Sequence, residues 1–176
     1  QSVTLRTAGF ASVDQGQLTG AGQGLSIVLM LIGGSSGSTA GGIKTVTFVV
    51  LLLFIRSRIR GKGSVDVFKR TVPEDKVMDA MTITSILTVL CVAGGVFISA
   101  VSGTEFAESL YEAASALGTV GLTTGITAGL GIPAQVLLIV FMYFGRVGVL
   151  TISLGFLLAD QAKQRFQYAR TNLLIG

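Results

Sequence analysis

Charged residues are scarce in this chain of 176 residues, where Asp, Glu, Lys and Arg together make up 12%. Soluble domains carry about 25% charged residues. Half of this chain is hydrophobic, and its mean hydropathy is +0.74. Because so few charges cannot cover the surface of a soluble fold, the composition indicates an integral membrane protein.

Histidine is absent, and cysteine and proline are rare. Without histidine the chain lacks the usual general base and metal ligand, and the single cysteine, Cys91, excludes an internal disulfide framework. The 2 prolines and 24 glycines fit close helix packing and irregular backbone in a membrane. The pI of about 9.6 does not indicate nucleic-acid binding, because the basic residues cluster where a cytoplasmic loop is expected. We predict no cofactor and no enzymatic chemistry.

A short motif occurs twice at a constant offset of 112 positions, as Thr7-Ala8-Gly9-Phe10 and as Thr119-Val120-Gly121-Leu122. The match continues at the same offset into the apolar segment after each copy, in the pairs Gln23/Gln135, Ile27/Ile139, Val28/Val140, Met30/Met142 and Gly33/Gly145. A repeat of this kind in an apolar chain indicates a membrane protein built from duplicated units.

Three apolar segments are long enough to cross a bilayer, at about 25–55, 81–101 and 132–159. A crossing needs roughly 20 helical residues, so the second and third segments suffice alone. The first is interrupted at 33–42 by five Gly, three Ser and one Thr. Its two halves suffice only together, as a broken transmembrane helix.

Residues 106–117 predict a helix that is too short to cross the membrane. We expect it to enter from outside and the chain to turn at 118–122 and return before the next span. This is a pore loop between two membrane helices. Irregular backbone at membrane depth is tolerated where protein or a water-filled cavity surrounds it, and a pore meets that condition.

Charge predicts the orientation. The segment between the first and second spans is basic, and so is the end of the chain: Arg56, Arg58, Arg60, Lys62, Lys69, Arg70 and Lys76, then Lys163, Arg165 and Arg170. Both regions, and hence the C-terminus, should be cytoplasmic. The acidic segment with Glu105, Glu108 and Glu112 should face outside, as should Asp14.

The expected fold is therefore an all-α membrane protein of repeated membrane–pore-loop–membrane units, with a broken transmembrane helix in the first unit. We divide it into the end of one pore unit (1–60), a basic cytoplasmic connection (61–80), a complete unit (81–160) and a cytoplasmic tail (161–176). Because the chain opens at Gln1, almost on a motif, we expect an N-terminal part to be missing.

The duplicated turn predicts an ion filter. A short helix aimed inward presents its negative C-terminal end to the cavity. The extended backbone after it can point carbonyls at a dehydrated cation, with Gly permitting unusual dihedral angles. The alternative is a Gly-rich turn that merely joins two helices, and the fixed spacing before two spans favours the filter.

These motifs resemble the Ktr/Trk/HKT superfamily of potassium transporters over essentially the whole chain. Arg6 to Phe10 is similar to the third filter loop of that family, and Thr119 to Gly125 is similar to the fourth. The resemblance implies a filter in which K⁺ is bound by backbone carbonyls. Its residues would be Thr7, Ala8, Gly9, Thr119, Val120 and Gly121, with Gly9 and Gly121 as the filter glycines.

The Gly-rich segment 33–42 leaves two structures open, a close helix crossing or an intramembrane loop. A phosphate-binding loop is disfavoured, because Ile43 separates Gly42 from Lys44. The family resemblance implies a mobile loop that gates conduction beneath the filter. The gating candidates are Gly33, Gly34, Gly37, Ser38, Thr39, Gly41, Gly42, Lys44 and Arg146.

Arg146 lies deep in an apolar span, where an unpaired charge is costly. We predict that it faces the pore below the filter and donates hydrogen bonds to carbonyls of the Gly-rich segment. The alternative is a structural ion pair, which the absence of Asp and Glu from these spans disfavours. For Lys44 two alternatives stay open: it snorkels to the cytoplasmic side, or it faces the conduction path.

The predicted function is potassium uptake across the plasma membrane, with K⁺ permeating passively or coupled to Na⁺. One alternative is a secondary transporter that carries another cation or a small solute through its discontinuous helix. Another is a non-conducting membrane scaffold. The resemblance further implies a homodimer in the lipid bilayer and a cytosolic nucleotide-binding ring subunit as regulator.

Overall fold

The computed structural model describes residues 1–35, 37–38, 40–61, 65–67 and 70–147. Within them the regular secondary structure is helical apart from one very short hairpin. The helices are α1 (Gly20–Leu31), α2 (Thr45–Ile59), α3 (Glu74–Ser102), α4 (Phe106–Leu117) and α5 (Ile132–Val147), with 3-10 turns at Gln15–Gln17 and Ile126–Gly129. The hairpin pairs β1 (Asp66–Val67) with β2 (Arg70–Thr71). The prediction of an all-α protein is confirmed.

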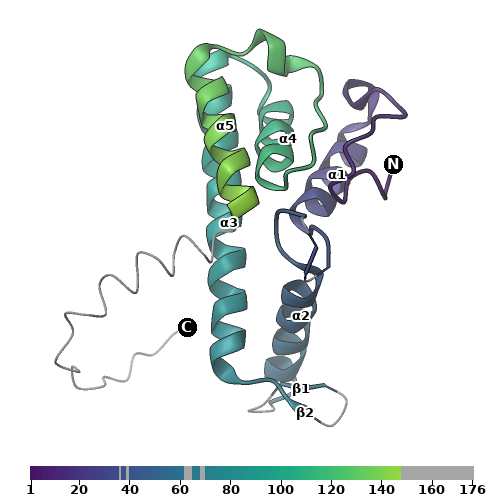
Figure 1. Cartoon of the computed structure of the whole chain (residues 1–176), viewed down its shortest axis with the longest axis vertical. Coiled ribbons are helices and arrows are strands. Elements are labelled where there is room, and N and C mark those ends of the chain that lie inside the picture. The colour runs from purple at the N-terminus through teal and green to yellow at the C-terminus, as the bar shows by residue number, and fades with distance from the viewer. Residues whose placement is uncertain (36, 39, 62–64, 68–69, 148–176) are drawn as a thin grey trace, which may run out of the picture.

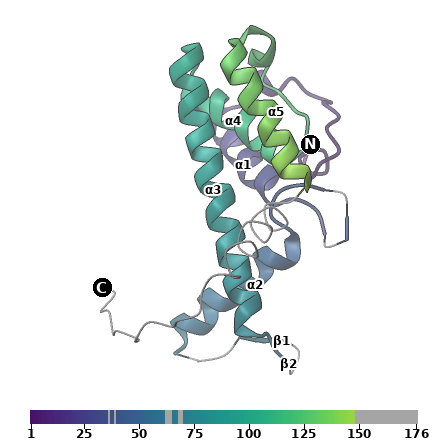
Figure 2. The ribbon, with the colours of Figure 1, turned by 60° about the vertical axis from the view of Figure 1, so that its left-hand side comes forward.

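Helix α3 runs the full height of the molecule, and the other elements lie along it (Figure 1). α1 and α2 follow one another beside it, with the hairpin at the α2 end. α4 and α5 lie against the other half of α3, and α4 contacts α1, α3 and α5. The turned view in Figure 2 keeps this arrangement, with the hairpin far from α4.

Helix α3 has 29 residues and would measure about 43 Å at 1.5 Å per residue. Glu74 and Asp75 lie in its first turn, where they complement the helix dipole, and Gly103 ends it with a left-handed φ of 65°. Among the described residues it is the one helix long and apolar enough to cross a membrane. The predicted span 81–101 lies inside it, although the helix begins earlier, at Glu74.

The other predicted spans correspond to shorter helices. The segment 25–55 overlaps α1 and α2, which are separate helices with irregular backbone between them. Thr19 caps α1 by accepting a hydrogen bond from the N–H of Gly22 at 3.2 Å, and Arg56 and Arg58 complement the dipole at the end of α2. α5 begins the third span, whereas residues 148–159 and the predicted tail 161–176 lie outside the described residues.

Helix α4 is the centre of the core. Its residues 111–117 are all buried, and Tyr111, Ala113, Ala114 and Leu117 are fully so. Small residues let its neighbours approach: a Cβ on Gly94 of α3 would overlap the ring of Phe141 in α5. Large apolar side chains on the outer faces of α1, α2, α3 and α5 are exposed in this chain, as expected for surfaces that meet lipid or further protein.

Candidate functional site

The two copies of the motif share an unusual backbone. Thr7 (φ 71°) and Thr119 (φ 54°) are the two non-glycine residues with positive φ in the part of the chain that the structure describes. Two positions later, Gly9 (φ 72°) and Gly121 (φ 87°) are also left-handed. A β-branched residue rarely takes this conformation, so its occurrence at the same place in both copies is a structural repeat. We call these segments the Thr7 turn (7–10) and the Thr119 turn (119–122).

The conformation of Thr119 follows from how α4 ends. The N–H of Val120 donates to the carbonyl of Ser115 at 2.9 Å, and the N–H of Thr119 donates to that of Ala116 at 3.1 Å. This is the Schellman pattern, which requires a left-handed residue and normally uses glycine there. A threonine at that position costs about 1–2 kcal/mol. Such strain persists where the surroundings impose it, and it is commonest at functional sites.

The two turns lie against each other. A Cβ on Gly9 would overlap the carbonyl oxygen of Val120, and one on Gly16 would come within 2.9 Å of the carbonyl oxygen of Thr124. The Thr7 turn is closed by the Thr4 hydroxyl, which donates to the Phe10 carbonyl at 2.6 Å. Segments 112 residues apart in sequence therefore meet through backbone atoms.

The Gly-rich segment 33–42 forms a loop whose base is closed by backbone hydrogen bonds. The N–H of Gly33 donates to Ile43, and the N–H of Ile43 donates to Leu31, both at 2.8 Å, which makes a short parallel bridge. Of the predicted gating residues, Thr39 lies outside the described residues. Gly33 and Gly41 are buried, and Gly37 and Ser38 are exposed. We refer to this segment as the Gly-rich loop.

Lys44, at the N-cap of α2, binds carbonyls of the Gly-rich loop. Its ammonium donates hydrogen bonds to the carbonyls of Ser38, at 3.1 Å, and Ala40. Neither alternative from the sequence, snorkelling or facing the conduction path, included this contact. The charge of Lys44 is thus directed at loop carbonyls, which ties the position of the loop to the start of α2.

The Gly-rich loop reaches the Thr119 turn. The backbone N–H of Gly41 donates to the hydroxyl of Thr119 at 3.0 Å. A Cβ on Gly41 would lie 2.6 Å from that hydroxyl oxygen and 2.9 Å from the carbonyl oxygen of Gly118, so the fit tolerates no side chain. The candidate gate and one candidate filter turn are in direct contact.

Arg146 lies in the last turn of α5, and its side chain is exposed in this chain. The preceding Gly145 packs on the end of α4, where a Cβ would overlap the carbonyl oxygen of Leu117 and come within 3.0 Å of the Thr119 methyl group. Arg146 therefore projects from a turn of helix that adjoins the Thr119 turn. Its predicted hydrogen bonds to the carbonyls of the Gly-rich loop stay a prediction.

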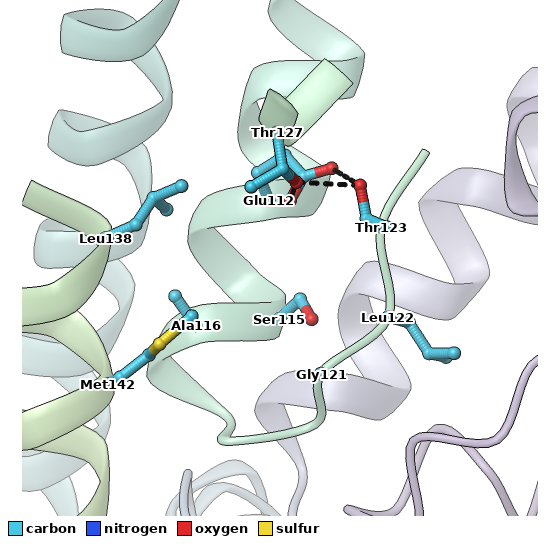
Figure 3. A pocket seen from close by; sticks show the side chains of 9 residues that line it. All are labelled: Glu112, Ser115, Ala116, Gly121, Leu122, Thr123, Thr127, Leu138 and Met142. Atoms are coloured by element: carbon cyan, nitrogen blue, oxygen red, sulfur yellow. Dashed lines mark hydrogen bonds between the residues drawn. The ribbon is translucent and has the colours of Figure 1, made fainter. Parts of the chain in front are cut away.

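Glu112 was not among the candidate site residues predicted from the sequence. The sequence places it in an acidic segment that is expected to face outside, but Glu112 is only 4% exposed. The carboxylate accepts hydrogen bonds from the segment that follows the Thr119 turn: the hydroxyls of Thr123 (2.5 Å), Thr124 (3.3 Å) and Thr127 (2.8 Å), and the N–H of Thr124 (3.0 Å). Figure 3 shows the carboxylate pointing from α4 toward Thr123 and Thr127. The available signal was a carboxylate in the same short unit as Thr123, Thr124 and Thr127, which lie 11, 12 and 15 positions after it.

A pocket of about 220 Å³ adjoins this cluster, between α4, α5 and the segment 121–127. Polar groups of Glu112, Thr123 and Thr127 line one part, and Leu138 and Met142 of α5 line another (Figure 3). The segment after the Thr119 turn therefore borders this pocket. Its contacts with the Glu112 side chain lie on one side of the pocket.

Tyr111, the neighbour of Glu112, makes the corresponding contact to the other copy. Its hydroxyl donates to the side-chain oxygen of Gln15 at 2.9 Å, and both side chains are buried. Gln15 is the repeat equivalent of Thr127, because the two positions are 112 apart. Adjacent residues of α4 thus bind equivalent positions behind the two turns.

Comparison with known proteins assigns the chain to a family. The model of the TrkH family, described as a cation transport protein, matches residues 1–166. The potassium/sodium uptake protein NtpJ of Enterococcus hirae is 38% identical over 99% of this chain and 40% of its own length. The Ktr system potassium uptake proteins B of Bacillus subtilis and Vibrio alginolyticus are 36% and 39% identical, over 94% and 100% of this chain and 37% and 38% of their own lengths.

The chain therefore spans about two fifths of the length of these relatives. All three are named as uptake proteins, in agreement with the apolar composition and with the length of α3. The resemblance drawn from the two turns is confirmed, and this all-α membrane chain belongs to the TrkH family of cation transport proteins.

Proposed function

We propose that the protein takes up potassium ions across the plasma membrane, and that the Thr7 and Thr119 turns form part of its ion filter. The observation that carries the proposal is the contact between Gly9 and Val120, which brings two turns of the same strained backbone together. The uptake activity named for the relatives supports K⁺ as the cation. The backbone carbonyls of both turns would bind the dehydrated ion.

The Gly-rich loop is the proposed gate. Support comes from its hydrogen bond to Thr119 and from the hold of Lys44 on its carbonyls. In this proposal α1 and α2 are the two halves of one broken inner helix, and the loop between them obstructs the path below the filter. Movement of the loop away from Thr119 would open that path, and Arg146 would add an electrostatic barrier to cations.

The hairpin end of the molecule is proposed to be cytoplasmic. Arg56, Arg58 and Arg60 lie at the adjoining end of α2, as the distribution of positive charge in membrane proteins requires. The turns then lie toward the outside, in pore units covering 1–60 and 81–160. We further propose a homodimer and a nucleotide-binding regulatory ring that docks on the basic connection, in keeping with the Ktr system named for two relatives.

The test is ion uptake by the full-length protein. We expect it to restore growth at low K⁺ to bacteria that cannot accumulate K⁺, and to take up Rb⁺, in competition with K⁺, when purified into liposomes. Uptake that is insensitive to K⁺ would contradict the proposal. Na⁺ coupling is measured in the same liposomes by imposing and removing a Na⁺ gradient.

The alternative is a secondary transporter that uses the interrupted α1–α2 segment to bind another solute. It predicts that a solute other than K⁺ or Rb⁺ competes for uptake or is itself accumulated. The contact between the two turns favours the filter instead, because a solute site at the break alone would leave the paired backbone geometry at Thr7 and Thr119 without a role.

A further inference from the structure

Glu112 is a buried carboxylate that the filter and gate do not by themselves require. Within the part of the chain that the structure describes, its four hydrogen bonds come from residues 123, 124 and 127, and they use both carboxylate oxygens. A buried carboxylate is costly unless donors surround it, and charge-assisted hydrogen bonds are stronger than neutral ones. The four contacts therefore stabilise one arrangement of the segment behind the Thr119 turn.

That segment has few backbone hydrogen bonds of its own. Among the described residues, no N–H of residues 121–125 donates to a backbone carbonyl. The N–H of Thr124 donates to Glu112 and that of Gly125 to the Thr123 hydroxyl. The adjoining pocket of about 220 Å³ leaves space into which the segment can shift. Gly121 immediately precedes it, so a shift would be transmitted to the carbonyls of the Thr119 turn.

We propose that Glu112 is a positioning residue for ion selectivity, which holds the Thr119 turn at the spacing that favours K⁺ over Na⁺. The inference rests on the proposed filter function. Selectivity among cations depends on how carbonyl ligands are placed around the ion, and Glu112 fixes the chain directly after those ligands. It acts through hydrogen bonds to Thr123, Thr124 and Thr127 and does not itself bind the ion.

Three substitutions separate the hydrogen bonds from the charge. Glu112→Ala removes both. Glu112→Asp keeps the charge but withdraws the carboxylate by one methylene from its donors. Glu112→Gln removes the charge and keeps the reach: its carbonyl oxygen can accept from Thr123 and Thr124 while its amide donates to the Thr127 hydroxyl, which is able to accept.

The measurement is Rb⁺ uptake by the full-length protein, normalised to the amount of protein in the membrane, in the presence of K⁺ or Na⁺. The quantity compared is the ratio of inhibition by K⁺ to inhibition by Na⁺. We expect this ratio to fall about tenfold in Glu112→Ala and Glu112→Asp, the factor that corresponds to one charge-assisted hydrogen bond. Glu112→Gln should stay within about threefold of the wild type by the same scale. Glu108→Gln, one turn earlier on α4, is the matched control and should leave the ratio unchanged.

A wild-type ratio in Glu112→Ala would overturn the inference, and so would an equal loss in Glu112→Gln, which would assign the effect to charge. If the Glu112 variants fail to reach the membrane, Thr127→Val removes one donor with little change of shape, and Thr127→Ser restores it. The ratio should fall in the first and recover in the second. Absence of K⁺-sensitive uptake in the wild type would instead refute the proposed function, so the two failures are distinguishable.

Discussion

The backbone N–H of Gly41 donates a hydrogen bond to the hydroxyl of Thr119 at 3.0 Å, across 78 positions of sequence. Thr119 is also the strained residue that ends α4 and begins the candidate filter turn. One residue therefore belongs to the candidate filter turn and, through its hydroxyl, contacts the Gly-rich loop. Any movement of the Gly-rich loop away from Thr119 must break this bond.

Replacing the Thr119 hydroxyl should loosen the gate. Thr119→Val keeps the β-branched shape and removes the acceptor, so we expect basal Rb⁺ uptake by the full-length protein to rise about fivefold, the factor for one hydrogen bond of about 1 kcal/mol. Thr119→Ser keeps a hydroxyl and should behave as the wild type. Equal uptake in the valine and serine variants would show that the bond does not restrain the loop.

The glycines of the two candidate filter turns, Gly9 and Gly121, should respond differently to alanine. Gly9→Ala introduces a Cβ that overlaps the Val120 carbonyl, and we expect it to abolish K⁺ uptake. Gly121→Ala meets open space and carries only the cost of a left-handed alanine, about 1–2 kcal/mol. It should retain uptake with a weaker preference for K⁺ over Na⁺. Wild-type uptake in Gly9→Ala would contradict the contact between the turns.

Much of this arrangement could be predicted from local sequence. The predicted helix 106–117 is confirmed with the same bounds by α4, whose ends are marked by Glu105 at the N-cap and Gly118 at the C-cap. The repeat of Thr and Gly predicted the repeat of backbone conformation at Thr7 and Thr119. In each case the signal lies within a few residues of the structure that it specifies.

The burial of Glu112 and the contacts of Lys44 could not be predicted, because both depend on how segments distant in sequence fold back on one another. Glu112 reads as one of three acidic residues in an outward-facing segment, and its burial follows only from the return of residues 123–127 across α4. The hold of Lys44 on the Gly-rich loop likewise depends on the path of the loop. Sequence spacing restricted Lys44 to a helix start but carried no information on which carbonyls it meets.

The ammonium of Lys44 should keep the gate closed. Lys44→Met removes the donor to the Ser38 and Ala40 carbonyls while preserving an unbranched stem, and we expect basal Rb⁺ uptake to rise severalfold. Lys44→Arg retains charge and donors and should stay near the wild-type rate. If methionine leaves basal uptake unchanged, the contact does not stabilise the closed loop.

Arg146 should oppose cation flow below the filter. Arg146→Ala removes a positive charge from the helix turn beside Thr119 and is expected to raise K⁺ flux or to weaken its regulation, whereas Arg146→Lys should preserve the barrier. The measurement is Rb⁺ uptake with and without the proposed regulatory ring subunit. An alanine variant with wild-type flux and wild-type regulation would refute the assignment.

The bond between Tyr111 and Gln15 should contribute to the stability of the paired turns. Tyr111→Phe leaves the buried side-chain oxygen of Gln15 without its donor, which costs about 1–3 kcal/mol. We therefore expect a lower thermal unfolding temperature for the purified protein in detergent. Tyr143→Phe on α5, where the tyrosine is 65% exposed, is the control and should unfold as the wild type does. Gln15 and Thr127 occupy equivalent positions in the two copies. A normal unfolding temperature in Tyr111→Phe would therefore mean that α4 stabilises the Thr119 turn but not the Thr7 turn.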